Sequence, residues 1–95
     1  MAIRVPKLVV YEEGGKTWQA PYGEGTPNSY ADCRDVARSI ISSHWHRVGD
    51  TVEKTHGHSS HPETVYIFSE GGEEICRYSK DDLLREENLH GTVNR

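Results

Sequence analysis

The strongest constraint on the fold is a pattern that occurs twice, a Glu-Gly-Gly turn between two segments rich in β-forming residues. The first copy covers residues 8–20, with sequence LVVYEEGGKTWQA, and the second covers residues 65–79, with sequence VYIFSEGGEEICRYS. Adjacent glycines can adopt the positive φ angles of a two-residue hairpin turn. The pattern therefore predicts two antiparallel hairpins.

The first hairpin has a favourable register if Gly14-Gly15 forms the centre of its turn. Glu13 then faces Lys16, and Tyr11 faces Trp18. Opposite charges and aromatic rings both stabilise a strand pair when they lie across from one another.

The second hairpin, with Gly71-Gly72 at its centre, predicts a strand in the middle of the sheet. Phe68 would face Ile75, and the neighbouring pair would be Ile67 and Cys76, so both faces carry apolar residues, as in a central strand. Glu70 would face Glu73 at the tip, beside Glu74, and like charges across a strand pair are destabilising.

The segment between the hairpins predicts one amphipathic helix over residues 29–43, with Ser29 and Asp32 as a capping pair. Its apolar stripe consists of Tyr30, Cys33, Val36, Ala37, Ile40 and Ile41. Residues 47–55 suggest a modest strand, interrupted at Gly49-Asp50. A short helix is expected near residues 80–88, capped by the Ser79-Lys80-Asp81-Asp82 segment.

These elements predict a single α+β domain over residues 1–95. Its two layers would be an antiparallel sheet of about five strands and one main helix, with a short C-terminal helix. The core candidates are Val9, Tyr11, Trp18, Cys33, Ala37, Ile40, Ile41, Val65, Ile67, Phe68 and Ile75.

Composition indicates a cytoplasmic protein. The sequence has no apolar run long enough to span a bilayer, and residues 3–7 are too polar for a signal peptide. Cys33 and Cys76 both fall at positions where apolar residues are expected, so they are interpreted as reduced, small core residues.

Acidic residues are concentrated near the C-terminus: residues 63–87 hold eight acids and three bases. This balance disfavours direct binding to nucleic acid and favours a protein partner with a basic surface. The predicted partner-binding residues form one negative patch, with Trp45 as an exposed aromatic anchor. The acidic members of the patch are Glu70, Glu73, Glu74, Asp81, Asp82 and Glu86.

Five of the six histidines lie within eighteen residues and suggest an alternative function, the binding of a metal ion such as zinc. These candidate ligands are His44, His46, His56, His58 and His61. No carboxylate or thiolate completes a recognisable zinc motif. The alternative to metal binding is that the histidines belong to a solvated loop. A further alternative is a homodimeric regulatory module that pairs through an exposed sheet edge.

Catalytic signatures are not found in the sequence. No glycine-bounded nucleophile turn surrounds either cysteine, and each Glu-Gly-Gly turn is followed by a strand instead of the helix that a phosphate-binding loop requires. We therefore expect a protein that is not an enzyme and that needs no cofactor.

The profile as a whole resembles the small phage-encoded inhibitors of bacterial defence, above all the anti-CRISPR proteins. The features that carry this resemblance are the strand pair, the helix over residues 29–43, the further strands and the surplus of acids in residues 63–87. The resemblance implies an inhibitor that binds a basic surface of a CRISPR effector complex and blocks access of nucleic acid. It rests on no shared motif, so it assigns no individual residue.

Overall fold

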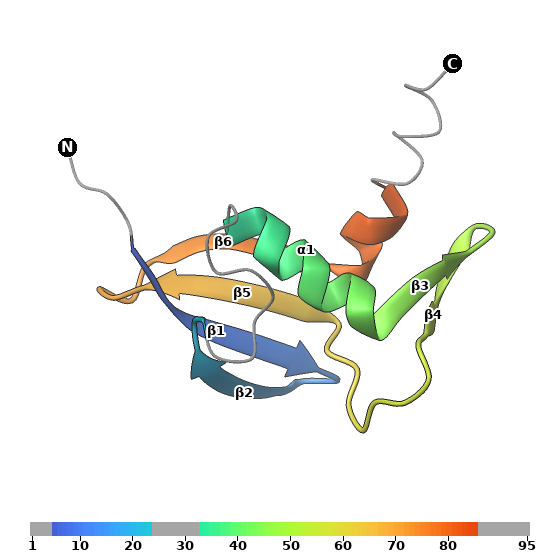
Figure 1. The fold of residues 1–95 in the computed structure, drawn as a ribbon, viewed down its shortest axis with the longest axis horizontal. Coiled ribbons are helices and arrows are strands. Elements are labelled where there is room, and N and C mark those ends of the chain that lie inside the picture. Colours follow the sequence, from blue (N-terminus) through green and yellow to red (C-terminus); the bar gives the residue numbers. More distant parts are fainter. Residues whose placement is uncertain (1–4, 24–32, 86–95) are drawn as a thin grey trace, which may run out of the picture.

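The computed structural model describes residues 5–23 and 33–85. In chain order these residues form β1 (Pro6–Glu13), β2 (Lys16–Pro21), α1 (Cys33–His44), β3 (Trp45–Val48), β4 (Thr51–Lys54), β5 (Thr64–Ser69) and β6 (Glu74–Ser79). Residues 80–85 are helical and follow β6 directly (Figure 1). The predicted α+β class is confirmed.

The main sheet is antiparallel and has four strands in the order β2-β1-β5-β6. The helix α1 packs on one face of this sheet, against β5 and β6 (Figure 1). The two layers match the prediction, and β5 occupies the predicted central position.

The segment predicted as an interrupted fifth strand forms a separate two-stranded sheet, β3-β4. Gly49, at φ 62°, and Asp50 form a turn, so Val48 pairs with Thr51. The main sheet therefore has four strands where about five were expected, and the two remaining short strands form a sheet of their own. The chain folds back on itself at this turn, so the two short strands hydrogen-bond to each other instead of to the main sheet.

The first hairpin has the predicted register. Glu13 pairs with Lys16 and Tyr11 pairs with Trp18, and the two aromatic rings stack with their centroids 5.6 Å apart. Gly14 and Gly15 have φ angles of 58° and 87°, as a two-residue turn with both central residues in the left-handed region requires.

The second hairpin has part of the predicted register. Ile67 pairs with Cys76 as expected, but Phe68 pairs with Glu74 and not with Ile75, because the ladder shifts between Ile67 and Phe68. An irregularity of this kind places one extra residue on one strand.

The tip of the second hairpin accounts for the shift. The amide of Gly72 donates to the carbonyl of Ser69 at 3.0 Å, and the amide of Ser69 donates to the carbonyl of Glu73 at 2.8 Å. The loop therefore contains residues 70–72, one more than in the first hairpin. Ser69, and not Glu70, lies opposite Glu73, so the predicted Glu70–Glu73 pair is wrong. The Ser69 hydroxyl accepts a further hydrogen bond from the Glu73 amide at 3.2 Å, and this contact favours the longer loop.

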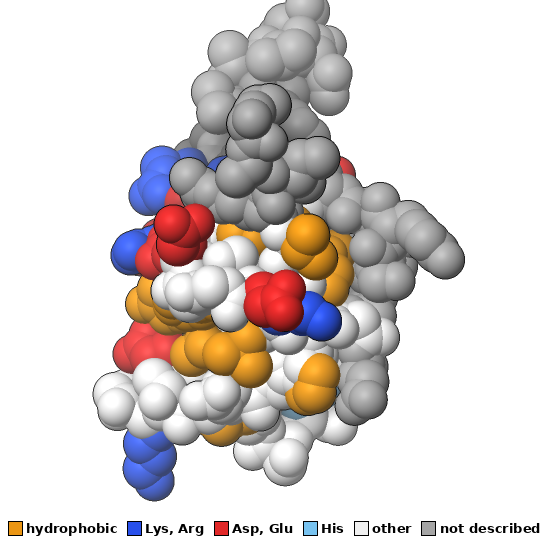
Figure 2. Space-filling view, turned by 90° about the vertical axis from the view of Figure 1, so that its left-hand side faces the viewer, with side chains coloured by type: hydrophobic (Ala, Val, Ile, Leu, Met, Phe, Trp, Pro, Cys, Tyr) orange, Lys and Arg blue, Asp and Glu red, His pale blue; other side chains and the backbone are white. Residues whose placement is uncertain are grey.

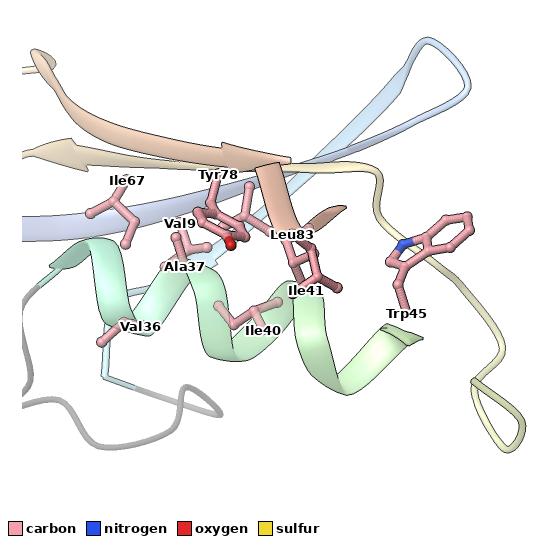
Figure 3. Close-up of a cluster of buried hydrophobic side chains, with 10 residues drawn as sticks. Val9, Val36, Ala37, Ile40, Ile41, Trp45, Ile67, Tyr78 and Leu83 are labelled. Atoms are coloured by element: carbon pink, nitrogen blue, oxygen red, sulfur yellow. The ribbon is translucent and has the colours of Figure 1, made fainter. Parts of the chain in front are cut away.

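Among the described residues, a cluster of buried side chains fills the space between α1 and the sheet (Figure 3). Tyr78 from β6 and Leu83 from the terminal helical segment join the residues of α1, β1 and β5. The cluster consists of Val9, Val36, Ala37, Ile40, Ile41, Trp45, Val65, Ile67, Tyr78 and Leu83.

Most core predictions are confirmed, either as fully buried residues or as partly buried residues packed against the cluster. The second group includes Tyr11, Ile75 and both cysteines, which are free thiols. Two predictions are wrong: Trp18 is 37% exposed, and Phe68 lies on the opposite face of the sheet, because side chains alternate along β5 and Ile67 faces the helix.

The ends of the helices agree with the sequence where they are described. The helix α1 ends at His44, one residue beyond the predicted end, whereas residues 29–32 and 86–88 of the two predicted helices lie outside the described residues. Asp82 accepts hydrogen bonds from the Ser79 amide and hydroxyl at 2.9 and 3.2 Å, and its own amide donates to the Ser79 hydroxyl. These bonds confirm the predicted cap. Among the described helices, none has the length and apolar character needed to cross a membrane.

Candidate binding surfaces

The acidic residues predicted as one patch lie in two groups at opposite ends of β6. Glu70 and Glu73 are exposed at the β5–β6 tip, whereas Asp81 and Asp82 follow the last residue of β6. A six-residue strand separates the groups, and it spans about 17 Å at about 3.3 Å per residue. Glu86 lies outside the described residues.

Two of these acids already have partners within the chain. Glu74 accepts two hydrogen bonds from the Arg77 guanidinium, at 2.8 and 2.9 Å. Asp82 caps the terminal helical segment and forms an ion pair with Arg85. Glu70 and Glu73 are exposed at the tip, and Asp81 is exposed at the far end.

Trp45 is buried, with 4% of its surface exposed, so the prediction of an exposed anchor is wrong. Its indole Nε1 donates to the carbonyl of Pro62 at 2.8 Å, and the Lys80 ammonium lies 4.5 Å from its ring centroid. The side chain thus joins the end of α1 to the loop before β5. Its place in the sequence, between two histidines after a helix, carries no signal of this long-range contact.

The five histidines, like the acidic residues, do not form one group. His44, His58 and His61 form one cluster, in which the ring centroids lie 4.2 Å apart for His44 and His58, 6.0 Å apart for His44 and His61, and 5.9 Å apart for His58 and His61. His46 contacts the Thr55 hydroxyl at 3.3 Å instead, and His56 is exposed on the loop.

Hydrogen bonds hold two rings of the cluster. Nδ1 of His44 lies 3.1 Å from the Ser60 carbonyl and Nε2 of His61 lies 2.8 Å from the Thr55 carbonyl, so both nitrogens are protonated donors. Burial and the adjacent His58 lower the pKa of His44, while the bond to Ser60 opposes the change. In residues 5–23 and 33–85, no three His, Cys, Asp or Glu side chains are placed to hold a metal ion.

The face of the sheet opposite α1 is a surface that the sequence interpretation missed. The strand register places three rows of residues across β2, β1, β5 and β6 on this face. The first row holds Pro21, Leu8, Phe68 and Glu74, the second holds Gln19, Val10, Tyr66 and Arg77, and the third holds Thr17, Glu12, Thr64 and Ser79. We call these twelve residues the open face.

The apolar centre of the open face consists of Leu8, Val10, Tyr66 and Phe68, all partly exposed. The Tyr66 and Phe68 rings lie 6.4 Å apart, and the Arg77 guanidinium lies 5.1 Å from the Tyr66 centroid. The alternation of side chains along β1 and β5 could have predicted this face. Leu8, Val10, Tyr66 and Phe68 occupy even-numbered positions, whereas the core residues of these two strands occupy odd-numbered ones.

A groove of about 450 Å³ lies at the end of the open face nearest the β5–β6 tip. Leu8, Val10 and Phe68 form its apolar lining, and Lys7 and Glu70 add charged side chains. Figure 2 shows the side of the molecule that carries this tip, where hydrophobic side chains lie at the surface between acidic and basic ones.

Comparison with known proteins found no match to any family model, curated protein or solved structure.

Proposed function

We propose that this protein is a non-catalytic interaction domain that binds a protein partner on the open face of its sheet. The observation that carries the proposal is the apolar centre of that face, where Leu8, Val10, Tyr66 and Phe68 stay partly exposed beside a groove. Contiguous exposed apolar side chains rimmed by polar residues are typical of interaction sites.

The partner we propose is basic. Glu70 and Glu73 are exposed at the tip beside the groove, and carboxylates on a rigid hairpin form charge-assisted hydrogen bonds with Arg and Lys. Surfaces that hold nucleic acid phosphates are rich in these two residues. A partner of this kind would make the protein an inhibitor of a nucleic-acid-handling assembly such as a CRISPR effector complex, in which it would block access of the nucleic acid.

The test is affinity capture from a bacterial lysate with wild-type protein and two variants, Val10→Asp on the open face and Val48→Asp on the β3–β4 hairpin. Val48 is 44% exposed and lies on the separate two-stranded sheet, so it is a matched control for placing a carboxylate on an exposed strand. Circular dichroism verifies that both variants fold.

We expect a captured protein that wild type and Val48→Asp retain, that Val10→Asp loses, and that rising salt releases because the contact includes ion pairs. Equal capture by both variants would show that the partner binds elsewhere and would refute the proposal.

A further inference from the structure

We infer that the outer edge of β2 is a self-association site, at which two copies of this chain pair their β2 strands antiparallel with Trp18 opposite Trp18. This site goes beyond the proposed function, because it uses the main chain of β2 and leaves the apolar centre of the open face uncovered. Three features of β2 support it: its hydrogen-bond pattern, the position of the Trp18 ring and a groove beside the strand.

The strand β2 lies at one edge of the main sheet and pairs with β1 on its inner side. The amide of Tyr22 donates to the carbonyl of Lys7 at 2.9 Å, so the even-numbered residues of β2 bond to β1. Successive residues of an antiparallel strand direct their main-chain groups to opposite sides. Those of Thr17, Gln19 and Pro21 therefore point away from the sheet, and the amides of Thr17 and Gln19 donate to no other described residue.

The outward groups of this edge are complementary to those of a second copy. Proline has no amide hydrogen, so the outward donors of β2 are Thr17 and Gln19, one on each side of Trp18. If Trp18 lies opposite Trp18, Thr17 of each copy lies opposite Gln19 of the other, and each such pair exchanges both of its main-chain hydrogen bonds. A register moved by two residues would place Thr17 opposite Pro21, where one of the two bonds has no donor. The pattern therefore favours the register centred on Trp18.

The Trp18 side chain is placed to contact its counterpart in this register. Its ring stacks on Tyr11 with the centroids 5.6 Å and the planes 9° apart, and 37% of the residue is exposed. Because the Trp18 main chain bonds to β1, the two tryptophans would form a non-hydrogen-bonded pair, the kind in which facing residues approach most closely. Aromatic pairs across two strands stabilise the pairing.

A groove of about 500 Å³ lies beside this edge at the first hairpin. In the register centred on Trp18, the second copy's Ala20 lies opposite Lys16, so a small side chain faces this end of the edge. The same strand serves both copies, so the pairing closes as a two-fold dimer. The groove is lined by Glu13, Gly14, Lys16, Thr17 and Trp18.

Sedimentation equilibrium of the wild-type chain tests whether it associates. Small interfaces are weak, so we expect a monomer at about 10 μM and a dimer at about 1 mM. Gln19→Pro removes an outward donor without removing a bond to β1, and it should weaken dimerisation about tenfold or more because a hydrogen bond is lost in each Thr17–Gln19 pair.

Lys54→Pro is the matched control for a proline on an exposed strand. Lys54 is an exposed residue of β4. The adjacent Thr55 amide donates to the His44 carbonyl, so the amide of Lys54 points away from β3. This variant should dimerise like wild type, and circular dichroism verifies that both proline variants fold.

Oxidative crosslinking tests the register and does not depend on a proline variant. In the paired strands, Trp18→Cys places the two thiols on residues about 4.5 Å apart at Cα, within the range of a disulfide. Thr17→Cys is the comparison, because its two copies would lie about 8 Å apart, beyond that range. We expect a crosslinked dimer on a non-reducing gel for Trp18→Cys alone, with wild type, whose Cys33 and Cys76 are free thiols, as the background.

The opposite results are equally specific. A monomer at every concentration, equal effects of the two proline variants, or equal crosslinking by the two cysteine variants would overturn the inference. A dimer lost in Val10→Asp and kept in Gln19→Pro would overturn it by placing self-association on the open face. A monomer whose capture of a lysate protein is lost in Gln19→Pro would overturn it by assigning the edge to a strand of another protein.

Discussion

Replacing Trp45 with Phe provides the sharpest test of the interior of this structure. The indole Nε1 donates to the carbonyl of Pro62 at 2.8 Å, and both residues are buried. Phe keeps an aromatic ring at this position but has no donor. The substitution therefore leaves the Pro62 carbonyl without its indole partner and removes part of the packing between α1 and the loop before β5.

The expected loss of stability follows from these two effects. An unsatisfied buried acceptor costs about 1–3 kcal/mol, and the smaller ring leaves a cavity that adds roughly 1 kcal/mol. The free energy of unfolding should therefore fall by about 2–4 kcal/mol. For a domain of this size each kcal/mol lowers Tm by about 4–8 °C, so the expected decrease in Tm is roughly 8–32 °C.

Urea unfolding followed by far-UV circular dichroism measures this loss without depending on tryptophan fluorescence. Trp18→Phe is the matched control, because Trp18 is 37% exposed and stacks on Tyr11, a contact that a phenyl ring can also make. We expect it to cost less than about 1 kcal/mol. If Trp45→Phe costs no more than Trp18→Phe, the buried hydrogen bond does not hold the loop and the reasoning fails.

Two further predictions concern the second hairpin and the histidine cluster. Gly72→Ala should destabilise the domain by about 1–2 kcal/mol, because φ is 89° at Gly72 and a side chain is strained in the left-handed region. Gly71→Ala should change the stability by less than about 0.5 kcal/mol. Equal effects of the two variants in thermal unfolding would contradict the three-residue loop. Folding lowers the pKa of His44 below the ordinary value of 6.5, so just below pH 6.5 this side chain binds more protons in the unfolded state than in the folded state. The free energy of unfolding should therefore have its full value above this pH and fall as the pH drops through it. Urea unfolding across this pH range should show the fall in wild type and a smaller one in His44→Gln; identical pH profiles would refute the assignment to His44.

The elements of the fold that could be predicted are those governed by neighbours in the sequence. The two-residue turn at Gly14-Gly15 determined the whole register of the first hairpin, because side chains alternate strictly once a turn is placed. The helix was predictable from its apolar stripe, and the Ser79–Asp82 cap from its spacing. In the second hairpin the same Glu-Gly-Gly triplet predicted the wrong loop length, because the preceding Ser69 can hydrogen-bond to the amide of Glu73.

The candidate surfaces were less predictable, because each depends on contacts between distant residues. The acidic patch looked continuous along the chain, but β6 separates its two ends, and Arg77 and Arg85 neutralise two of its members. The histidine cluster combines the end of α1 with a loop more than a dozen residues later. Five histidines are close in sequence, yet only three come into ring contact.

Local periodicity and turn chemistry are sufficient to specify the antiparallel hairpins, the amphipathic helix and the α+β class. Which apolar residues remain exposed depends instead on how these elements pack. Ile67 and Phe68 are adjacent and equally apolar, but α1 covers one face of the sheet, so Ile67 joins the core while Phe68 stays on the open face. Trp45 shows the converse. Its place in the sequence predicted an exposed anchor, but the side chain is buried, and its indole donates a hydrogen bond to a carbonyl seventeen residues away.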